Sequence, residues 1–448
     1  MPNTNGRDLT QGSIVKNLLI FAVPYLIANF IQAMYGAVDM AIVGWFADSA
    51  GISAVSTGSQ VMQIVTCLVS GLTMGSTILI AQYFGAKQQE DTTQTIRTTL
   101  SLFAVAAAVL TLLMLVFTKP MLYLLQTPPE AFEDAVGYVT VASCGILFIF
   151  GYNAISAILR GLGDSQSPMI FVGIACVTNI LLDLLCVGMF GMGPAGAALA
   201  TILSQGLSMA LAILYLSRKN FLFTFHWKNF KIDRGKANNL FRIGLPISLQ
   251  DTMVNLSFLV IAAIVNSMGV VTSAAVGIAG KFESFAMLPA SAFSAAIASM
   301  TAQNMGARQP ERAKKTMNIG IALSLGCALL FFAWVQLFPS SVMLIFQADS
   351  QVVAAGTEYL RAFSFDFLMV SFVFCMNGFF NGCGHTAYTM ANGLVATILI
   401  RVPMAFLMSR CLPESLFGIG LAAPAASLLS IIWGLFYIRS GRWRKTKI

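Results

Sequence analysis

The sequence has little charge and few of the residues that metal or nucleotide chemistry needs. Only 10% of its 448 residues are charged, and its two histidines, His226 and His385, lie far apart. A soluble chain carries about 25% charged residues. The eight cysteines are scattered through apolar stretches without paired spacing, and no GxxxxGK[ST] segment is present. These absences argue against a soluble protein, a disulfide-stapled fold, a zinc site or a P-loop ATPase.

Long apolar stretches dominate the chain instead. It is 57% hydrophobic, with a mean hydropathy of +0.79. About twelve stretches exceed the ~20 residues that cross a bilayer as a helix. We expect an all-α integral membrane fold of twelve transmembrane helices, with spans near residues 16–44, 51–84, 95–119, 131–160, 166–189, 194–217, 240–267, 273–303, 316–338, 352–381, 387–410 and 417–438.

The chain states one pattern twice. AQYFGAKQ (81–88) recurs as AQNMGARQ (302–309), 221 residues later, and the same spacing pairs LRGLGDSQSPM (159–169) with FNGCGHTAYTM (380–390). Tyr138 pairs in this way with Tyr359. Six helices per half make the two repeats parallel, which is typical of transporters. We expect an N-terminal lobe over 1–219, a basic cytoplasmic linker over 220–236 and a C-terminal lobe over 237–448.

Basic residues predict the orientation. With a cytoplasmic N-terminus, twenty Lys and Arg residues fall on the inner side, whereas Lys119, Arg361 and Arg410 fall on the outer side. This asymmetry predicts a multi-pass protein of the plasma membrane with both termini in the cytoplasm. The basic segment 218–236 is interpreted as a topology anchor, since it belongs to no recognisable nucleic-acid-binding module. We therefore expect membrane lipids and no nucleic acid among its partners.

Acidic residues inside apolar helices mark the candidate site, because such residues are costly in a membrane and usually functional. Asp39 and Asp183 each lie about 8–9 Å below the outer end of their helices, and Thr201 lies at a similar depth. Asn179 is four residues before Asp183, on the same helical face. Two carboxylates with no basic residue at that depth should hold a proton, a sodium ion or a cationic substrate.

The second half lacks this acidic pair. The repeat spacing maps Asn179 near Ile400, Asp183 near Met404 and Asp39 near Ala262. It carries charges of both signs instead, namely Asp251, Lys281, Glu283, Asp366 and Arg401. These charges either pair internally or act in substrate binding or gating. Glu283 and Asp366 are candidate contacts for a cationic drug.

The sequence resembles the multidrug and toxic compound extrusion (MATE) transporters over nearly all of its length. The resemblance is carried by QAMYGAVDMAIVG after Pro24, the paired AQYFGAKQ and AQNMGARQ, the RGLGDSQSP turn, and VTNILLDLL followed by GPAGAALAT. The last two motifs, with Asp39, are similar to the prokaryotic DinF-type branch. The segment ISLQDTMVNLS places Asp251 nearer the proline than the NorM-type pattern expects.

The resemblance implies an antiporter that exports organic cations in exchange for protons or sodium. It implies that Asp39, Asn179, Asp183 and Thr201 form the ion-coupling cluster, which would also be the sodium site, and that Gln32, Tyr35 and Asn153 line the drug cavity. Pro24 is a candidate hinge in the first helix. We expect a monomer that needs no cofactor beyond the coupling ion and transports small cationic amphipathic molecules.

Two alternatives remain open at this point. A flippase of lipid-linked precursors has a related two-lobe architecture, but its anionic headgroup would need several basic residues in the cavity, and only Lys281 and Arg401 are candidates. A membrane enzyme is disfavoured because the sequence shows no nucleophile and base in a catalytic arrangement.

Overall fold

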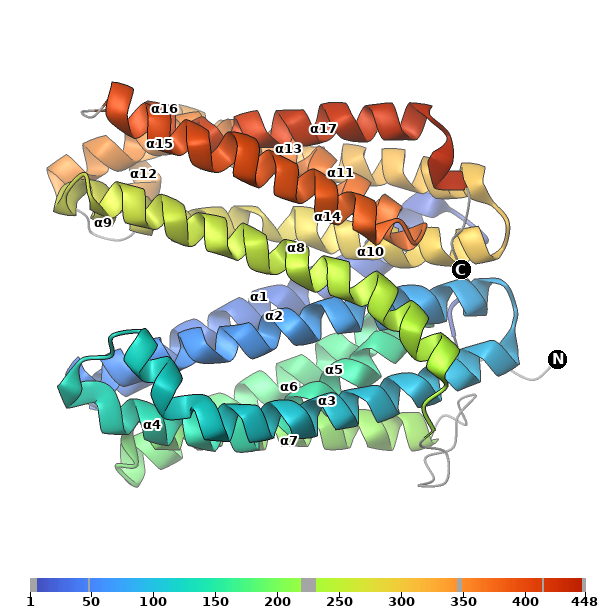
Figure 1. Cartoon of the computed structure of the whole chain (residues 1–448), viewed down its shortest axis with the longest axis horizontal. Coiled ribbons are helices and arrows are strands. Elements are labelled where there is room, and N and C mark those ends of the chain that lie inside the picture. Colours follow the sequence, from blue (N-terminus) through green and yellow to red (C-terminus); the bar gives the residue numbers. More distant parts are fainter. Residues whose placement is uncertain (1–5, 47–48, 219–230, 345–348, 413–414, 445–448) are drawn as a thin grey trace. The chain divides into compact units, whose positions relative to one another are not determined.

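The elements of the described chain are helical (Figure 1). A computed structural model describes residues 6–46, 49–218, 231–344, 349–412 and 415–444. Its first half contains α1 (Ile14–Phe46), α2 (Ser49–Gly85), α3 (Gln89–Leu124), α4 (Pro129–Cys144), α5 (Ile146–Gly161), α6 (Gln166–Asp183), the π-helical turn η1 (Leu184–Met189) and α7 (Gly193–Arg218).

The second half contains a corresponding series. It runs through α8 (Arg234–Asn266), α9 (Val270–Ala286), α10 (Leu288–Gly306), α11 (Pro310–Leu337), α12 (Pro339–Leu344), α13 (Ser350–Gly382), α14 (Thr386–Val395), the π-helical turn η3 (Ala396–Arg401), α15 (Val402–Cys411), α16 (Phe417–Gly420), α17 (Ala422–Arg439) and η4 (Arg442–Arg444).

Eleven helices of the described chain are long and apolar enough to cross a membrane. The number is twelve if α4 and α5, which bend by 44° at Gly145, form one span. Large side chains such as Leu112 and Val116 of α3 stay 65% and 61% exposed, as expected for a lipid-facing surface. The expectation of an all-α membrane protein with about twelve spans is confirmed.

The repeated sequence motifs adopt repeated turns. α2 and α10 each end at a glycine, and the basic residue two positions later is left-handed in both, with φ 59° at Lys87 and 57° at Arg308. In the paired RGLGDSQSP and NGCGHTAYT segments, Gly163 and Gly384 have φ of 88° and 83°. Glycine adopts this region without a Cβ penalty. The backbone therefore repeats along with the sequence.

The chain folds into two compact units that exchange their first helical segments. One unit is built mainly from Ile27–Ser248, and the other from Leu9–Leu26 and Leu249–Ile448. We call them the N-terminal and C-terminal units. α1 and α8 each change unit two residues after an internal proline, Pro24 and Pro246.

These units differ from the predicted lobes at both segments. Residues 9–26 pack in the C-terminal unit, where Leu18 and Phe21 join a buried cluster with Ile297 and Phe379. The first part of α8 packs in the N-terminal unit, where a Cβ on Gly75 would lie 2.9 Å from Gly244. Packing across helices, which hydropathy does not encode, causes the difference. Residues 220–230, which are most of the predicted linker, lie outside the described residues.

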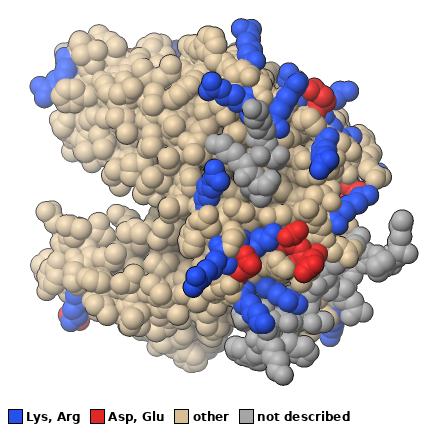
Figure 2. All heavy atoms as spheres, turned by 45° about the vertical axis from the view of Figure 1, so that its right-hand side comes forward, with Lys and Arg blue, Asp and Glu red and all other residues tan. Residues whose placement is uncertain are grey.

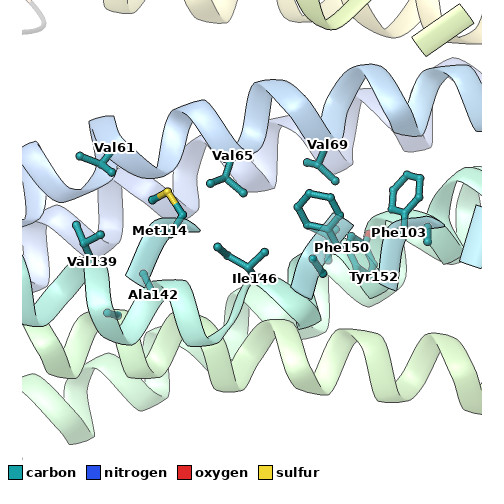
Figure 3. Close-up of a cluster of buried hydrophobic side chains, with 14 of the residues drawn as sticks. Val61, Val65, Val69, Phe103, Met114, Val139, Ala142, Ile146, Phe150 and Tyr152 are labelled. Atoms are coloured by element: carbon teal, nitrogen blue, oxygen red, sulfur yellow. The ribbon is translucent and has the colours of Figure 1, made fainter. Parts of the chain in front are cut away.

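The core of the N-terminal unit lies between α2, α4 and α5 (Figure 3). Val61, Val65 and Val69 recur every four residues and so share one face of α2, toward Ile146 and Phe150. The rings of Phe150 and Phe103 of α3 meet edge to face, 5.8 Å apart. This packing anchors the helices that surround the acidic residues described next.

Candidate functional site

Three helices of the N-terminal unit carry the predicted ion-coupling residues. Asp39 lies on α1, Asn179 and Asp183 on α6, and Thr201 on α7. Asn179 and Asp183 are one turn apart and both fully buried, and Asp39 is only 7% exposed. α6 changes to the π-helical turn η1 directly after Asp183. Such turns often occur at functional sites, because they redirect side chains within a helix.

The four side chains meet at the carboxylate of Asp39. Asn179 Nδ2 donates to Asp39 Oδ1 over 3.4 Å, and Thr201 Oγ1 donates to Asp39 Oδ2 over 3.5 Å. Both distances are at the long end for hydrogen bonds, so neutral donors hold this carboxylate loosely. The structure therefore brings together the four residues that the sequence singled out.

Asp183 lies beside Asp39 in the same buried cluster. The two carboxyl groups are close enough to interact directly. Both oxygens of Asp183, and Oδ1 of Asn179, are buried and have no hydrogen-bond partner among the described residues. Two ionised carboxylates are acceptors only, so they can share a hydrogen bond only when one holds a proton.

In the part of the chain that the structure describes, neither acid is paired with a basic side chain. Among the described residues, no ion pair within 4 Å involves Asp39 or Asp183. A buried negative pair of this kind needs a bound proton or cation. Carboxylate, amide and hydroxyl oxygens suit a hard cation such as sodium. Among the described residues, no group of three or more His, Cys, Asp or Glu could hold a metal.

Tyr138 of α4 is a neighbour that the sequence reasoning did not assign to the site. Its side chain is 7% exposed, its hydroxyl lies 3.3 Å from Ser59 Oγ, and it interacts electrostatically with both Asp39 and Asp183. Its repeat partner, Tyr359, contacts Glu283 in the C-terminal unit. The 221-residue pairing of the two tyrosines was the signal that could have placed both beside acidic groups.

The residues predicted for drug binding in this unit are less tightly held. Gln32 is exposed on α1, two turns before Asp39. Asn153 of α5 is half-buried and its Nδ2 donates back to Ile149 O over 2.9 Å. The side chain of Tyr35 lies outside the described part of the structure.

The predicted charges of the C-terminal unit form a mixed cluster. Glu283 of α9, Asp366 of α13 and Arg401 of η3 are each less than 10% exposed. Ser427 donates to Asp366 Oδ1 over 2.6 Å, and the Arg401 guanidinium lies 3.9 Å from the centre of the Phe258 ring. Arg401 interacts electrostatically with both acids.

Close internal pairing of these charges is not what the structure shows. No ion pair within 4 Å joins Glu283, Asp366 and Arg401 among the described residues. Lys281 is exposed on α9, and Asp251 is half-buried on α8 without an ion-pair partner in the same described set.

Basic side chains gather at one end of the helices. Figure 2 shows Lys and Arg concentrated on the side near the labelled chain ends. Lys87, Arg160 and Lys236 lie at helix ends of the N-terminal unit, and Arg308 lies between α10 and α11 of the C-terminal unit. Lys119 lies near the opposite end of α3.

Comparison with known proteins gives consistent matches over the whole chain. The probable multidrug resistance protein YpnP of Bacillus subtilis (strain 168) is 28% identical over 454 residues, covering 98% of both chains. The probable multidrug resistance protein NorM of Thermotoga maritima is 26% identical, covering 97% of this chain and 94% of its own. The outward-facing structure of a multidrug resistance MATE family transporter of the MOP superfamily superposes with a TM-score of 0.93, at 22% identity and full coverage of both chains.

The profile of the MatE family matches twice, over residues 24–185 and 246–407. The two matches have equal length and are offset by 222 residues (246 − 24 and 407 − 185), which agrees with the internal repeat. Together they cover more than half of the chain. The chain therefore belongs to the MatE family of multi-pass membrane transporters and is not an enzyme.

Proposed function

We propose that this transporter is an antiporter that exports organic cations, drugs among them, in exchange for protons or sodium ions. One observation carries the proposal: two buried carboxylates, Asp39 and Asp183, touch each other with only neutral donors around them. Relatives named as probable multidrug resistance proteins support the drug-export part. The acidic N-terminal cluster also supports the DinF-like branch.

The coupling follows because this cluster has more hydrogen-bond acceptor oxygens than donors. A proton can sit between the two carboxyl groups, or a sodium ion can take up the free oxygens of Asp183 and Asn179. Either event removes negative charge that would attract a cationic substrate. Ion entry and substrate binding then oppose each other, and each weakens the other by the same factor.

The helix that carries Asp39 offers a route from the ion to a change of conformation. Pro24 interrupts the hydrogen bonds of α1, and the helix changes unit two residues later. A proline inside a helix allows a bend at that place. We infer that Pro24 acts as a hinge when the charge at Asp39 changes, and that Gln32, Tyr35 and Asn153 of the N-terminal unit contact the transported cation.

The orientation is part of the same proposal. Basic residues gather at one end of the helices, and the positive-inside rule assigns this end to the cytoplasm. Reporter fusions after Arg218 and after Arg444 should both report a cytoplasmic location. A signal from the outer side for either fusion would reverse the orientation.

A liposome assay tests the proposed function. Purified protein is reconstituted with a fluorescent organic cation, and a proton or a sodium gradient is imposed in separate experiments. We expect one gradient to drive cation movement, and Asp39→Asn or Asp183→Asn to stop it. Movement of a lipid-linked pyrophosphate instead of the cation would favour the flippase alternative.

A further inference from the structure

We propose that the C-terminal unit holds a second binding site, in which Arg401 and Glu283 bind the carboxylate and the ammonium group of one small amphoteric aromatic molecule. The proposal goes beyond cation export, because it concerns another unit and a ligand with both charges.

The site is a cavity of about 260 Å³ within the C-terminal unit. Arg401 and Glu283 line it together with Phe258, Tyr359 and Phe363. It extends to the turn between α8 and α9, where its lining residue Asn266 is exposed. Its volume lies just below the ~300–1,000 Å³ of common small-molecule sites, so it suits a molecule with one ring.

The cavity stands where the repeat places the acidic site of the other unit. The 222-residue offset of the two family matches pairs Asp39 with Ile261 and Asn179 with Arg401, and the 221-residue spacing of the repeated motifs moves each pairing by one residue. Both Ile261 and Arg401 line the cavity. The same place in the fold is thus acidic in one unit and carries an arginine in the other.

Two charged side chains at this cavity each have a buried polar atom without a hydrogen-bond partner in the described structure. Arg401 is 8% exposed and Glu283 is 5% exposed, and both Nε of Arg401 and Oε1 of Glu283 are buried without a hydrogen-bond partner among the described residues. No ion pair within 4 Å joins them in the described structure. Unpaired buried charges are costly, so a ligand that contacts both would stabilise the unit.

The surroundings of the two groups fix the chemistry of the ligand. The guanidinium of Arg401 lies over the Phe258 ring, 3.9 Å from its centre, and its N–H groups can donate to a carboxylate. Tyr359 contacts the Glu283 carboxyl, so Oε1 is the oxygen left for an ammonium group. Tyr359 and Phe363, stacked 5.7 Å apart, offer an aromatic wall to a ring.

Three related compounds test this site by titration calorimetry on the purified full chain. L-phenylalanine carries both charges, 3-phenylpropionate only the carboxylate, and 2-phenylethylamine only the amine. We expect L-phenylalanine to bind at least about 10-fold more tightly than either, which equals about 1.4 kcal/mol. Arg401→Gln should reduce its affinity to that of 2-phenylethylamine, and Glu283→Gln to that of 3-phenylpropionate.

A cavity-filling variant keeps the test valid if a charge variant fails to fold. Gly277 lines the cavity, and a Cβ there would meet no heavy atom within 4 Å. Gly277→Leu should therefore not lower the melting temperature, and its side chain should abolish binding of L-phenylalanine by occupying the cavity. Asp39→Asn, in the other unit, should leave this binding intact.

Three outcomes would overturn the proposal. They are no binding of any of the three compounds, equal binding of all three, and unchanged binding of L-phenylalanine by Gly277→Leu. Cation export in the liposome assay does not depend on these outcomes, so the two proposals can fail separately.

Discussion

The two units share a fold but differ in the charge at the same place. In the N-terminal unit, Asp39 and Asp183 lie together with neutral donors only. In the C-terminal unit, Arg401 lies within one residue of the position that the repeat pairs with Asn179, and it interacts electrostatically with Glu283 of α9 and Asp366 of α13. A duplicated body needs only one ion-coupling site, so the second copy is free to carry another function. The difference shows that the repeat determines the fold of each unit, whereas a few side chains determine what each unit can bind.

The largest effect is expected from removing an acid of the N-terminal unit. Asp183→Asn keeps the shape of the side chain and removes the charge that attracts the coupling ion. We expect gradient-driven export in liposomes to fall by about 100-fold or more, with normal insertion and folding. Equal loss from Glu283→Gln would mean that coupling is not confined to the N-terminal unit.

The next effect concerns the swapped first part of α8. A Cβ on Gly75 would lie 2.9 Å from the backbone of Gly244, so Gly75→Ala should destabilise the N-terminal unit by about 1–3 kcal/mol. The melting temperature of the purified protein measures this. Gly36→Ala on α1, where nothing lies within 4 Å, is the matched control. Similar melting temperatures for both variants would argue against the close contact of α2 with α8.

A smaller effect is expected from the weakest ligand of the acidic site. Thr201 donates to Asp39 over 3.5 Å, a long hydrogen bond. Thr201→Ala should raise the ion concentration needed for half-maximal export by about 3–10-fold without abolishing export. Thr201→Ser, which keeps the hydroxyl, should behave like the wild type. Complete loss of export in Thr201→Ala would contradict this prediction, because it would make Thr201 essential for export despite its long hydrogen bond.

The smallest effect is expected from Met404 and Ala262, which lie within two residues of the positions that the repeat pairs with Asp183 and Asp39. Met404→Leu and Ala262→Leu change apolar side chains of the C-terminal unit, which carries no acidic pair there. We expect the ion dependence of export to stay within about 2-fold of the wild type. A loss comparable with that of Asp183→Asn would show that the two units share the coupling site.

Most of the fold could be predicted from the sequence, because a membrane restricts the choice to helices whose length and hydropathy are visible in the chain. The repeated turns could also be predicted, since AQYFGAKQ and AQNMGARQ are similar in sequence. Both have a left-handed backbone conformation at the equivalent positions Lys87 and Arg308. The exchange of segments at Pro24 and Pro246 was not visible. This exchange depends on which helices pack together. Because the helices of both units are apolar, hydropathy does not show which unit a segment packs against.

The acidic site could be predicted as residues but not as geometry. Depth along the helices predicted that Asp39, Asn179, Asp183 and Thr201 share a level, and their contacts agree with it. The π-helical turn after Asp183 and the approach of Tyr138 were missed, because both follow from packing between helices. In the C-terminal unit, the charged residues could be identified from the sequence. Only the structure shows that they form no close ion pairs among the described residues.

One binding measurement tests the central claim that Asp39 couples ion and substrate. A fluorescent organic cation is titrated into the purified wild type and into Asp39→Asn between pH 5 and pH 9. For the wild type, affinity should fall as pH falls, because protons neutralise the carboxylates that attract the cation. Asp39→Asn fixes one carboxylate of the pair in its neutral form and leaves Asp183 alone, so its affinity should change much less with pH. A mutant that keeps the wild-type pH profile would contradict the account.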